Sequence, residues 1–226
     1  MWRISPLFAA WIASPQNALF REEVLGPTST VMELGCGISG IVALSLAGRV
    51  GKYIATDQEY LLKVLKQNID ENLAELQPSK SKKATAKRKV RAGKISNFRT
   101  KVEVMALDWE LSSLSSLPSL LGDSGAVDAV IACDCIYNEA LIEPLVRTCA
   151  DICRLKAAMN SKTPTICIVA QQLRSSDVFE AWAKAFSRPF SFWRLPDVLL
   201  SGELRSDSGY VVHLGILRET PSVESP

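Results

Sequence analysis

Hydrophobic and polar positions follow two different periods along this chain. Short apolar runs rich in β-branched residues occur at 30–34, 51–57, 101–108, 126–133 and 163–171. Runs of this length are typical of strands buried in a parallel sheet. Between them, apolar residues recur three or four positions apart, as expected of amphipathic helices. These helical patterns lie at 39–50, 59–76, 140–159 and 176–187. The alternation predicts βαβ units with right-handed crossovers.

The end of the chain follows a different pattern. Two late strand-like runs, 190–196 and 208–219, have no helical segment between them, so we expect an antiparallel hairpin at the sheet edge. The predicted fold class is α/β: a Rossmann-like, doubly wound, mostly parallel seven-stranded sheet with this C-terminal edge hairpin. We expect residues 1–226 to form a single domain, because 47% hydrophobic and 22% charged residues suit one large core.

Composition narrows the functional classes. The longest apolar runs are too short to span a bilayer, and the first residues lack the apolar stretch of a signal peptide. We therefore expect no membrane contact and a cytoplasmic protein, with the nucleus as the alternative. We also expect a monomer. The six cysteines include no C-x-x-C pair, and His213 is the only histidine. This argues against a metal site and against a hydrolase built on histidine; His213 itself is expected to pack in a strand.

One segment interrupts the pattern. Residues 79–101 contain ten lysines and arginines and no acid, so the rest of the chain, which has a total charge of +2, carries about −8. We expect residues 79–100 to be a basic flexible insertion between a helix and a strand. Two interpretations stay open: a solvated loop, or a contact with RNA or a ribosome. We expect a disordered tail at 220–226. The pattern at 111–125 predicts a loop with a short helical turn.

The stretch "VMELGCGISG" (31–40) points to a cofactor. Its glycines, Gly35, Gly37 and Gly40, have the spacing G-x-G-x-x-G, which lets a backbone turn approach a nucleotide closely. Asp57 ends the next predicted strand, 22 positions after Gly35, where an acid binds ribose hydroxyls. A dinucleotide and S-adenosylmethionine both carry such a ribose. This motif alone does not separate the two.

Acidic residues at strand ends favour the second cofactor. Glu33, Asp57, Asp108 and Asp134 all stand where predicted parallel strands end, the edge at which ligands bind. Glu33 would repel a pyrophosphate and attract an ammonium beside a sulfonium; its alternative role is in a helix start or an ion pair. A dehydrogenase would also need a substrate domain, for which the chain has no room.

At this point the motifs resemble a known family. "ELGCGISG", "ATD", "LDWE" and above all "CDCIY" are similar to the class I, seven-strand S-adenosylmethionine-dependent methyltransferases. The D-x-x-Y pattern after the fourth strand resembles the family-16 protein lysine methyltransferases. "TDQEYLLKVLKQNIDEN" and "CDCIYNEALIEPLV" are most similar to the fungal ribosomal lysine methyltransferases, whose substrate is a large-subunit ribosomal protein.

The resemblance implies roles for individual residues. On the cofactor side these are Trp2 as a shield, Gly35, Cys36 and Gly37 as a floor, Asp57 on the ribose, Asp108 and Trp109 on the adenine, and Cys133 through its backbone. Catalytic roles fall to Asp134 and Tyr137, which would flank the lysine entry. Asp134 would anchor the ammonium or hold the local backbone. Family members carry more chain before the tryptophan, so we expect a weaker grip on the cofactor here.

Three hypotheses follow. The first is a protein lysine N-methyltransferase whose substrate is a ribosomal or translation-related protein. The second keeps the fold and S-adenosylmethionine but methylates RNA or a small molecule; the absence of an N-P-P-Y or D-P-P-Y turn counts against RNA bases. The third is a non-catalytic module that binds a ribosome through residues 79–101. Glu33, Asp57 and Asp134 count against that module, since binding alone does not need them.

Overall fold

The computed structural model describes residues 3–75, 100–112, 117–121, 125–159 and 161–218. Trp2, the expected tail at 220–226 and all but the last residue of the expected insertion at 79–100 lie outside these residues. The expectations for them stay predictions.

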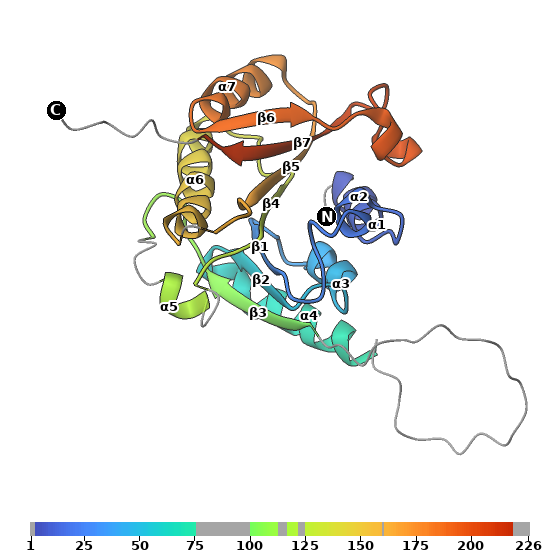
Figure 1. Cartoon of the computed structure of the whole chain (residues 1–226), viewed down its shortest axis with the longest axis vertical. Coiled ribbons are helices and arrows are strands. Elements are labelled where there is room, and N and C mark those ends of the chain that lie inside the picture. The colour runs from blue at the N-terminus through green and yellow to red at the C-terminus, as the bar shows by residue number, and fades with distance from the viewer. Residues whose placement is uncertain (1–2, 76–99, 113–116, 122–124, 160, 219–226) are drawn as a thin grey trace, which may run out of the picture.

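A seven-stranded sheet with the order β3-β2-β1-β4-β5-β7-β6 forms the centre of the protein (Figure 1). Its strands are β1 (Thr30–Leu34), β2 (Lys52–Asp57), β3 (Lys101–Ala106), β4 (Ala129–Cys133), β5 (Ile166–Gln172), β6 (Phe190–Arg194) and β7 (Tyr210–Leu217). The first five pair in parallel. β7 pairs antiparallel with both β5 and β6. The predicted fold class and the antiparallel edge hairpin are therefore confirmed.

Every strand except β1 is shorter than the sequence pattern predicts, and β3 and β4 show physical reasons for this. β3 ends at Ala106 because its last pairing partner on β2 is Asp57, where β2 itself ends. β4 begins at Ala129 rather than at position 126. The carboxylate of Asp128 accepts a hydrogen bond of 2.8 Å from the backbone N–H of Thr30, and the N–H of Asp128 donates to the carbonyl of Thr30 at 2.8 Å, so Asp128 contacts β1 through its side chain as well as its backbone.

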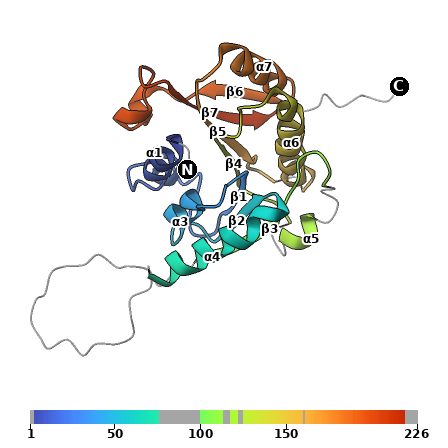
Figure 2. The same ribbon diagram turned by 180° about the vertical axis from the view of Figure 1, so that it is seen from behind.

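Helices cover both faces of the sheet. They are α1 (Ile4–Ile12), α2 (Ala18–Arg21), α3 (Ile41–Leu46), α4 (Glu59–Glu75), α5 (Leu117–Leu121), α6 (Ile142–Ala158) and α7 (Ser176–Ser187). Within the described part of the chain, 3-10 turns accompany them at η3 (Glu139–Leu141), η4 (Asp197–Leu199) and η5 (Gly202–Leu204). Figures 1 and 2 show α1, α3 and α4 on one side of the sheet and α5, α6 and α7 on the other. This is the arrangement of a doubly wound fold.

The apolar stripes of these helices form two cores, one on each face. Leu65 and Ile69 of α4, one helical turn apart, are buried in the first core. The second core contains Trp182 of α7, whose ring lies 5.1 Å from that of His213 on β7. His213 thus packs in a strand, as predicted. Burial lowers the pKa of its imidazole to about 4.

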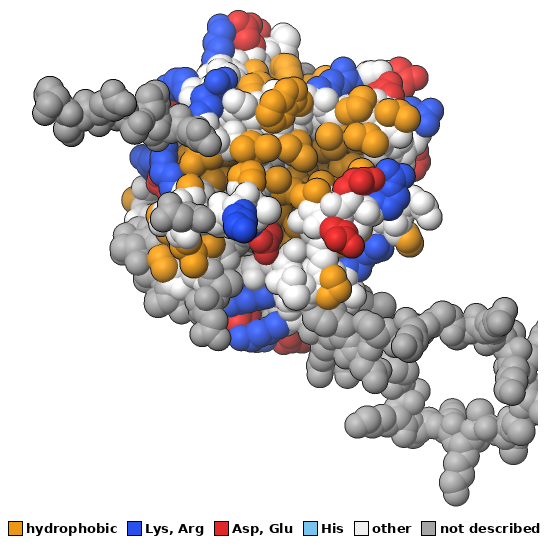
Figure 3. All heavy atoms as spheres, viewed as in Figure 1, with side chains coloured by type: hydrophobic (Ala, Val, Ile, Leu, Met, Phe, Trp, Pro, Cys, Tyr) orange, Lys and Arg blue, Asp and Glu red, His pale blue; other side chains and the backbone are white. Residues whose placement is uncertain are grey.

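The outer surface is mixed in character. Figure 3 shows hydrophobic side chains gathered where Figure 1 places β5, β6 and β7, with charged side chains mostly around them. Trp193 on the edge strand β6 is 56% exposed. Among the described residues, no helix combines the length and apolar character that a bilayer crossing requires.

Candidate active site

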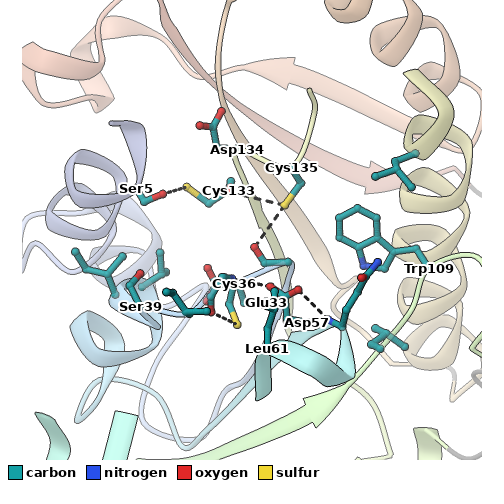
Figure 4. Close-up of a pocket in the computed structure, with 18 of the residues that line it drawn as sticks. Ser5, Glu33, Cys36, Ser39, Asp57, Leu61, Trp109, Cys133, Asp134 and Cys135 are labelled. Atoms are coloured by element: carbon teal, nitrogen blue, oxygen red, sulfur yellow. Dashed lines mark hydrogen bonds between the residues drawn. The ribbon is translucent and has the colours of Figure 1, made fainter. Parts of the chain in front are cut away.

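A pocket of about 570 Å³ opens at the carboxyl ends of the central strands. It lies where β1 pairs with β2 on one side and β4 on the other, which is the point where ligands bind in doubly wound sheets. Ten residues that the sequence identified line it: Glu33, Gly35, Cys36, Gly37, Asp57, Asp108, Trp109, Cys133, Asp134 and Tyr137. Every predicted site residue that the structure describes therefore lies at this one pocket (Figure 4).

The glycine turn after β1 forms one wall. Gly35 and Gly37 have φ values of +64° and +65°, a region that side chains rarely adopt. A Cβ on Gly35 would lie 2.9 Å from the sulfur of Cys135 and 3.0 Å from the ring of Trp109. The backbone N–H of Gly37 donates to a carboxylate oxygen of Asp57 at 2.7 Å. Glycine is therefore required at position 35 for both conformation and space.

Asp57 ends β2 and lines the pocket beside this turn. Its second carboxylate oxygen accepts a hydrogen bond of 2.8 Å from the N–H of Gln58. Each oxygen has lone pairs beyond these bonds. Asp57 can therefore hold the glycine turn in place and still accept hydrogen bonds from a ligand hydroxyl.

Glu33 is a buried acid in the pocket wall. It is the fourth residue of β1 and only 2% exposed. The hydroxyl of Tyr53 donates to its carboxylate at 2.8 Å. The pKa of the Glu33 carboxyl is raised from 4.5 to about 7 in total. Burial is the largest cause; the Tyr53 hydrogen bond lowers the pKa, and the charge of Asp57 raises it. The alternative role at a helix start is wrong, because Glu33 lies inside a strand.

The turn after β3 places an aromatic ring in the pocket. One carboxylate oxygen of Asp108 accepts hydrogen bonds from the N–H groups of Glu110 and Leu111, at 2.8 and 3.1 Å. These side-chain to backbone hydrogen bonds hold the turn that contains Trp109. The carbonyl of Trp109 accepts from Arg147 of α6 at 3.2 Å. Asp108 therefore positions the aromatic side chain in addition to lining the pocket.

Asp134, directly after β4, has an unexpected partner. Its carboxylate accepts two hydrogen bonds from the guanidinium of Arg174, at 2.8 and 2.6 Å. Figure 4 shows this carboxylate pointing away from Glu33 and Asp57. Arg174 was not singled out in the sequence. The only signal for Arg174 in the sequence is its position shortly after β5 and next to Ser175, which caps α7.

The pocket has a further lining residue, Ser5, that sequence spacing does not identify. Ser5 of α1 lines it and lies 3.9 Å, oxygen to sulfur, from Cys133. Tyr137 lines it as well and is 56% exposed. Burial raises the pKa of the thiols of Cys36 and Cys133 far above the ordinary range. These cysteines are therefore poor nucleophiles and act as small apolar wall residues.

The charged side chains that line the pocket have one sign, although one of them, Asp134, is paired with Arg174 outside the lining. The charged lining residues are Glu33, Asp57, Asp108, Glu110 and Asp134, and no lysine, arginine or histidine lines the pocket among the described residues. Such a lining attracts a cationic ligand and repels phosphates. Trp109 offers an apolar face. Fold and pocket together define a class: an α/β protein with a nucleoside-sized, acidic pocket at the switch point of its sheet.

Comparison with known proteins narrows this class to a family. The model of a family described as "Lysine methyltransferase" matches residues 1–90 and 80–179. The chain therefore belongs to the lysine methyltransferase family.

Curated relatives share a large part of the sequence. Ribosomal lysine N-methyltransferase 5 of Zygosaccharomyces rouxii is 34% identical over 198 residues, covering 80% of this chain and 61% of that protein. The protein of the same name from Lachancea thermotolerans is 30% identical over 217 residues, covering 80% and 64%. The chain thus spans under two thirds of the length of these relatives.

Solved structures share the fold. The N-methyltransferase NodS from Bradyrhizobium japonicum, in complex with S-adenosyl-L-homocysteine, has a TM-score of 0.51 at 9% identity, covering 96% of this chain and 92% of that chain. A methyltransferase from Pyrococcus furiosus has a TM-score of 0.50 at 11% identity, covering 95% and 96%. At these identities the likeness concerns the fold alone.

Proposed function

We propose that this protein is an S-adenosylmethionine-dependent protein-lysine N-methyltransferase whose substrate is a ribosomal protein. The proposal rests above all on the pocket, whose charged lining residues are all acidic. Membership of the lysine methyltransferase family supports the reaction. The names of its relatives, ribosomal lysine N-methyltransferases, support the substrate class.

The acidic lining discriminates between cofactors. A nicotinamide dinucleotide carries a pyrophosphate, and Glu33 lies two positions before the glycine turn that would have to hold it. Like charges in a partly dehydrated site repel by on the order of 1 kcal/mol or more. S-adenosylmethionine carries an ammonium and a sulfonium instead. The same carboxylates that oppose a dinucleotide would attract these two cations.

The described residues fit the parts of this cofactor. The turn of Gly35, Cys36 and Gly37 lines the pocket, and at Gly37 the lack of a side chain leaves open space where the methionine part would lie. Asp57 can accept hydrogen bonds from ribose hydroxyls. Trp109 has an aromatic face for the adenine. Glu33 would pair with a cationic group of the methionine part.

Transfer to a lysine needs positioning more than acid–base chemistry. When bound, the cofactor supplies a methyl group that its positive sulfur already activates, so the enzyme has to align a neutral amine with it. Lysine ordinarily has a pKa near 10.4 and is charged at neutral pH. Apolar walls, such as those given by Cys133 and Leu141, disfavour the charged form. We expect the ammonium to give its proton to solvent water as it enters the channel, so that a neutral amine reaches the methyl group.

RNA is a weaker candidate for the substrate. Its phosphates would face a pocket with five acidic and no basic lining residues among those described. A protein lysine brings a cation, which this lining attracts. The charge of the pocket therefore favours a protein over RNA for the group that enters, whatever residues 79–101 contact elsewhere.

The test uses tritiated S-adenosylmethionine and ribosomes from cells that lack this protein. Addition of the purified protein is expected to label one protein band, with mass spectrometry locating methylated lysine. The label should be lost on protease treatment and survive ribonuclease. The Asp57→Ala variant serves as the control and should transfer no label. Label that ribonuclease removes would refute the substrate class, and no S-adenosylmethionine binding in calorimetry would refute the cofactor.

A further inference from the structure

The turn after β4 has a strained backbone. Asp134 has a φ of +60°, one of two non-glycine residues with positive φ among those described. Aspartate adopts this region more readily than most residues, but surrounding structure must hold it there. Asp134 is also buried, with a side chain that is 0% exposed. A buried carboxylate on a strained turn needs a partner to compensate for lost water.

Arg174 and the end of β5 provide that compensation. The guanidinium binds both carboxylate oxygens of Asp134, at 2.8 and 2.6 Å. The N–H of Gln172 donates to one of them at 3.3 Å, and the N–H of Asp134 donates to the carbonyl of Ala170 at 2.7 Å. The hydrogen bonds to Asp134 raise the pKa of Arg174 above its usual value. Four bonds thus join the turn after β4 to the end of β5.

This arrangement leaves little of the Asp134 carboxylate for a substrate. Two parallel N–H···O bonds from one guanidinium are the most directional pairing that a carboxylate makes. The carboxylate also points away from Glu33 and Asp57 (Figure 4). A lysine ammonium would have to displace the guanidinium to reach it. The geometry disfavours Asp134 as the group that anchors the substrate amine or takes its proton.

The same turn holds the wall through which a lysine would enter. Cys133 and Tyr137, on either side of Asp134, both line the pocket. The thiol of Cys135 has its own contact, 3.1 Å from the carbonyl oxygen of Leu34 on β1. The turn is therefore held at two adjacent residues, at Asp134 by Arg174 and at Cys135 by the contact with β1, and Tyr137 follows two residues after Cys135.

We propose that Arg174 is a positioning residue, which clamps the strained turn at Asp134 and thereby fixes the wall of the substrate channel. This inference rests on the proposed function, since it assigns the channel to a lysine. In this arrangement Asp134 acts through the backbone that it holds, and Arg174 acts through Asp134. Loss of either partner therefore removes the same pair of hydrogen bonds from the turn.

A double-mutant cycle on methyl transfer tests the clamp. Arg174→Lys keeps the charge and loses the paired geometry, and Asp134→Asn removes the carboxylate while tolerating positive φ. We expect each to lower kcat at least tenfold with the Kd for S-adenosylhomocysteine within threefold of wild type. The double variant should fall within about threefold of the worse single variant, because both act through one contact. Arg154→Lys, which alters an exposed pair with Asp151, serves as the control and should leave kcat unchanged.

Three results would overturn the proposal. They are an unchanged kcat in Arg174→Lys, multiplicative losses in the double variant, and a loss in Asp134→Asn more than tenfold beyond that in Arg174→Lys. The last would mean that Asp134 acts on the substrate directly. If a single variant does not fold, the pair Asp134→Asn with Arg174→Gln is measured instead, since it leaves no buried charge unpaired. It should show the same tenfold loss of kcat at an unchanged Kd, and wild-type kcat would overturn the clamp.

Hydrogen exchange separates this proposal from the proposed function. If the wild-type protein transfers no methyl group, the clamp is judged on backbone amides alone. Exchange in residues 134–137 should become at least tenfold faster in Arg174→Lys, with β1 and β2 unchanged. Unchanged exchange at that turn would overturn the clamp whatever the reaction is.

Discussion

Replacing Glu33 by glutamine isolates the effect of one buried charge. Glutamine has nearly the same shape, and its carbonyl can accept the hydrogen bond that the Tyr53 hydroxyl now gives to the carboxylate at 2.8 Å. It does not titrate. Any difference in pH dependence between the two proteins therefore comes from the ionisation of Glu33.

The size of the effect follows from the pKa. Burial raises the pKa of Glu33 from 4.5 to about 7 in the folded protein. The folded state then binds a proton more tightly than the unfolded state, so this contribution to stability is full below pH 4.5 and is lost as pH rises to 7. A pKa difference of about 2.5 corresponds to about 3 kcal/mol. Relative to wild type, the variant should gain about 3 kcal/mol in unfolding free energy between pH 4 and pH 8.

The assay is urea unfolding of both proteins at several pH values, with the difference in unfolding free energy plotted against pH. His213 titrates in the opposite direction over part of this range, because burial lowers its pKa to about 4. It is present in both proteins, so its effect cancels in the difference. A difference that stays flat from pH 4 to pH 8 would refute the reasoning.

Ligand binding gives a second measurement on the same variant. If Glu33 pairs with a cation of S-adenosylmethionine, binding near pH 7 should drive off the proton that the buried carboxyl holds. Calorimetry in two buffers of different ionisation enthalpy should show proton release for wild type and none for Glu33→Gln. The variant should also bind S-adenosylmethionine at least tenfold more weakly. Equal proton release by both proteins would contradict the assignment.

Three further predictions concern other positions. Asp57→Ala should abolish S-adenosylmethionine binding in calorimetry, because it removes both the ribose acceptor and the acceptor for the Gly37 N–H at 2.7 Å; retained binding would contradict the ribose role. Gly35→Ala should lower Tm and cofactor affinity, because the new Cβ would lie 2.9 Å from the sulfur of Cys135. Gly209 has a φ of +77° and open space around it, so Gly209→Ala should lose only about 1–3 kcal/mol of unfolding free energy from backbone strain. His213→Phe should reduce the loss of unfolding free energy between pH 6.5 and pH 4, because the buried imidazole resists the proton that the unfolded chain binds in this range. Urea unfolding measures this, and the same loss in both proteins would contradict the prediction.

Much of the fold was accessible from the sequence, because each part of it has a local cause. All seven strands and four of the helices follow from apolar periodicity, and α7 begins and ends where its pattern predicts, at Ser176 and Ser187. The boundaries of β3 and β4 were less accessible. They depend on where the neighbouring strand stops and on one side chain, Asp128, whose carboxylate accepts from the N–H of Thr30 just before β4 begins.

For the site, the sequence predicts the location of the acidic residues better than it predicts their roles. Carboxyl ends of parallel strands meet at one edge of a sheet, so strand order alone gathers the four acids there. Their partners, listed in chain order, are the Tyr53 hydroxyl for Glu33, backbone N–H groups for Asp57, a local turn for Asp108 and the Arg174 guanidinium for Asp134. A hydroxyl leaves a buried acid able to hold a proton near pH 7, whereas a guanidinium commits a carboxylate to structure. Position in the sequence predicts which acids line the pocket, and the partner of each decides what it can do there.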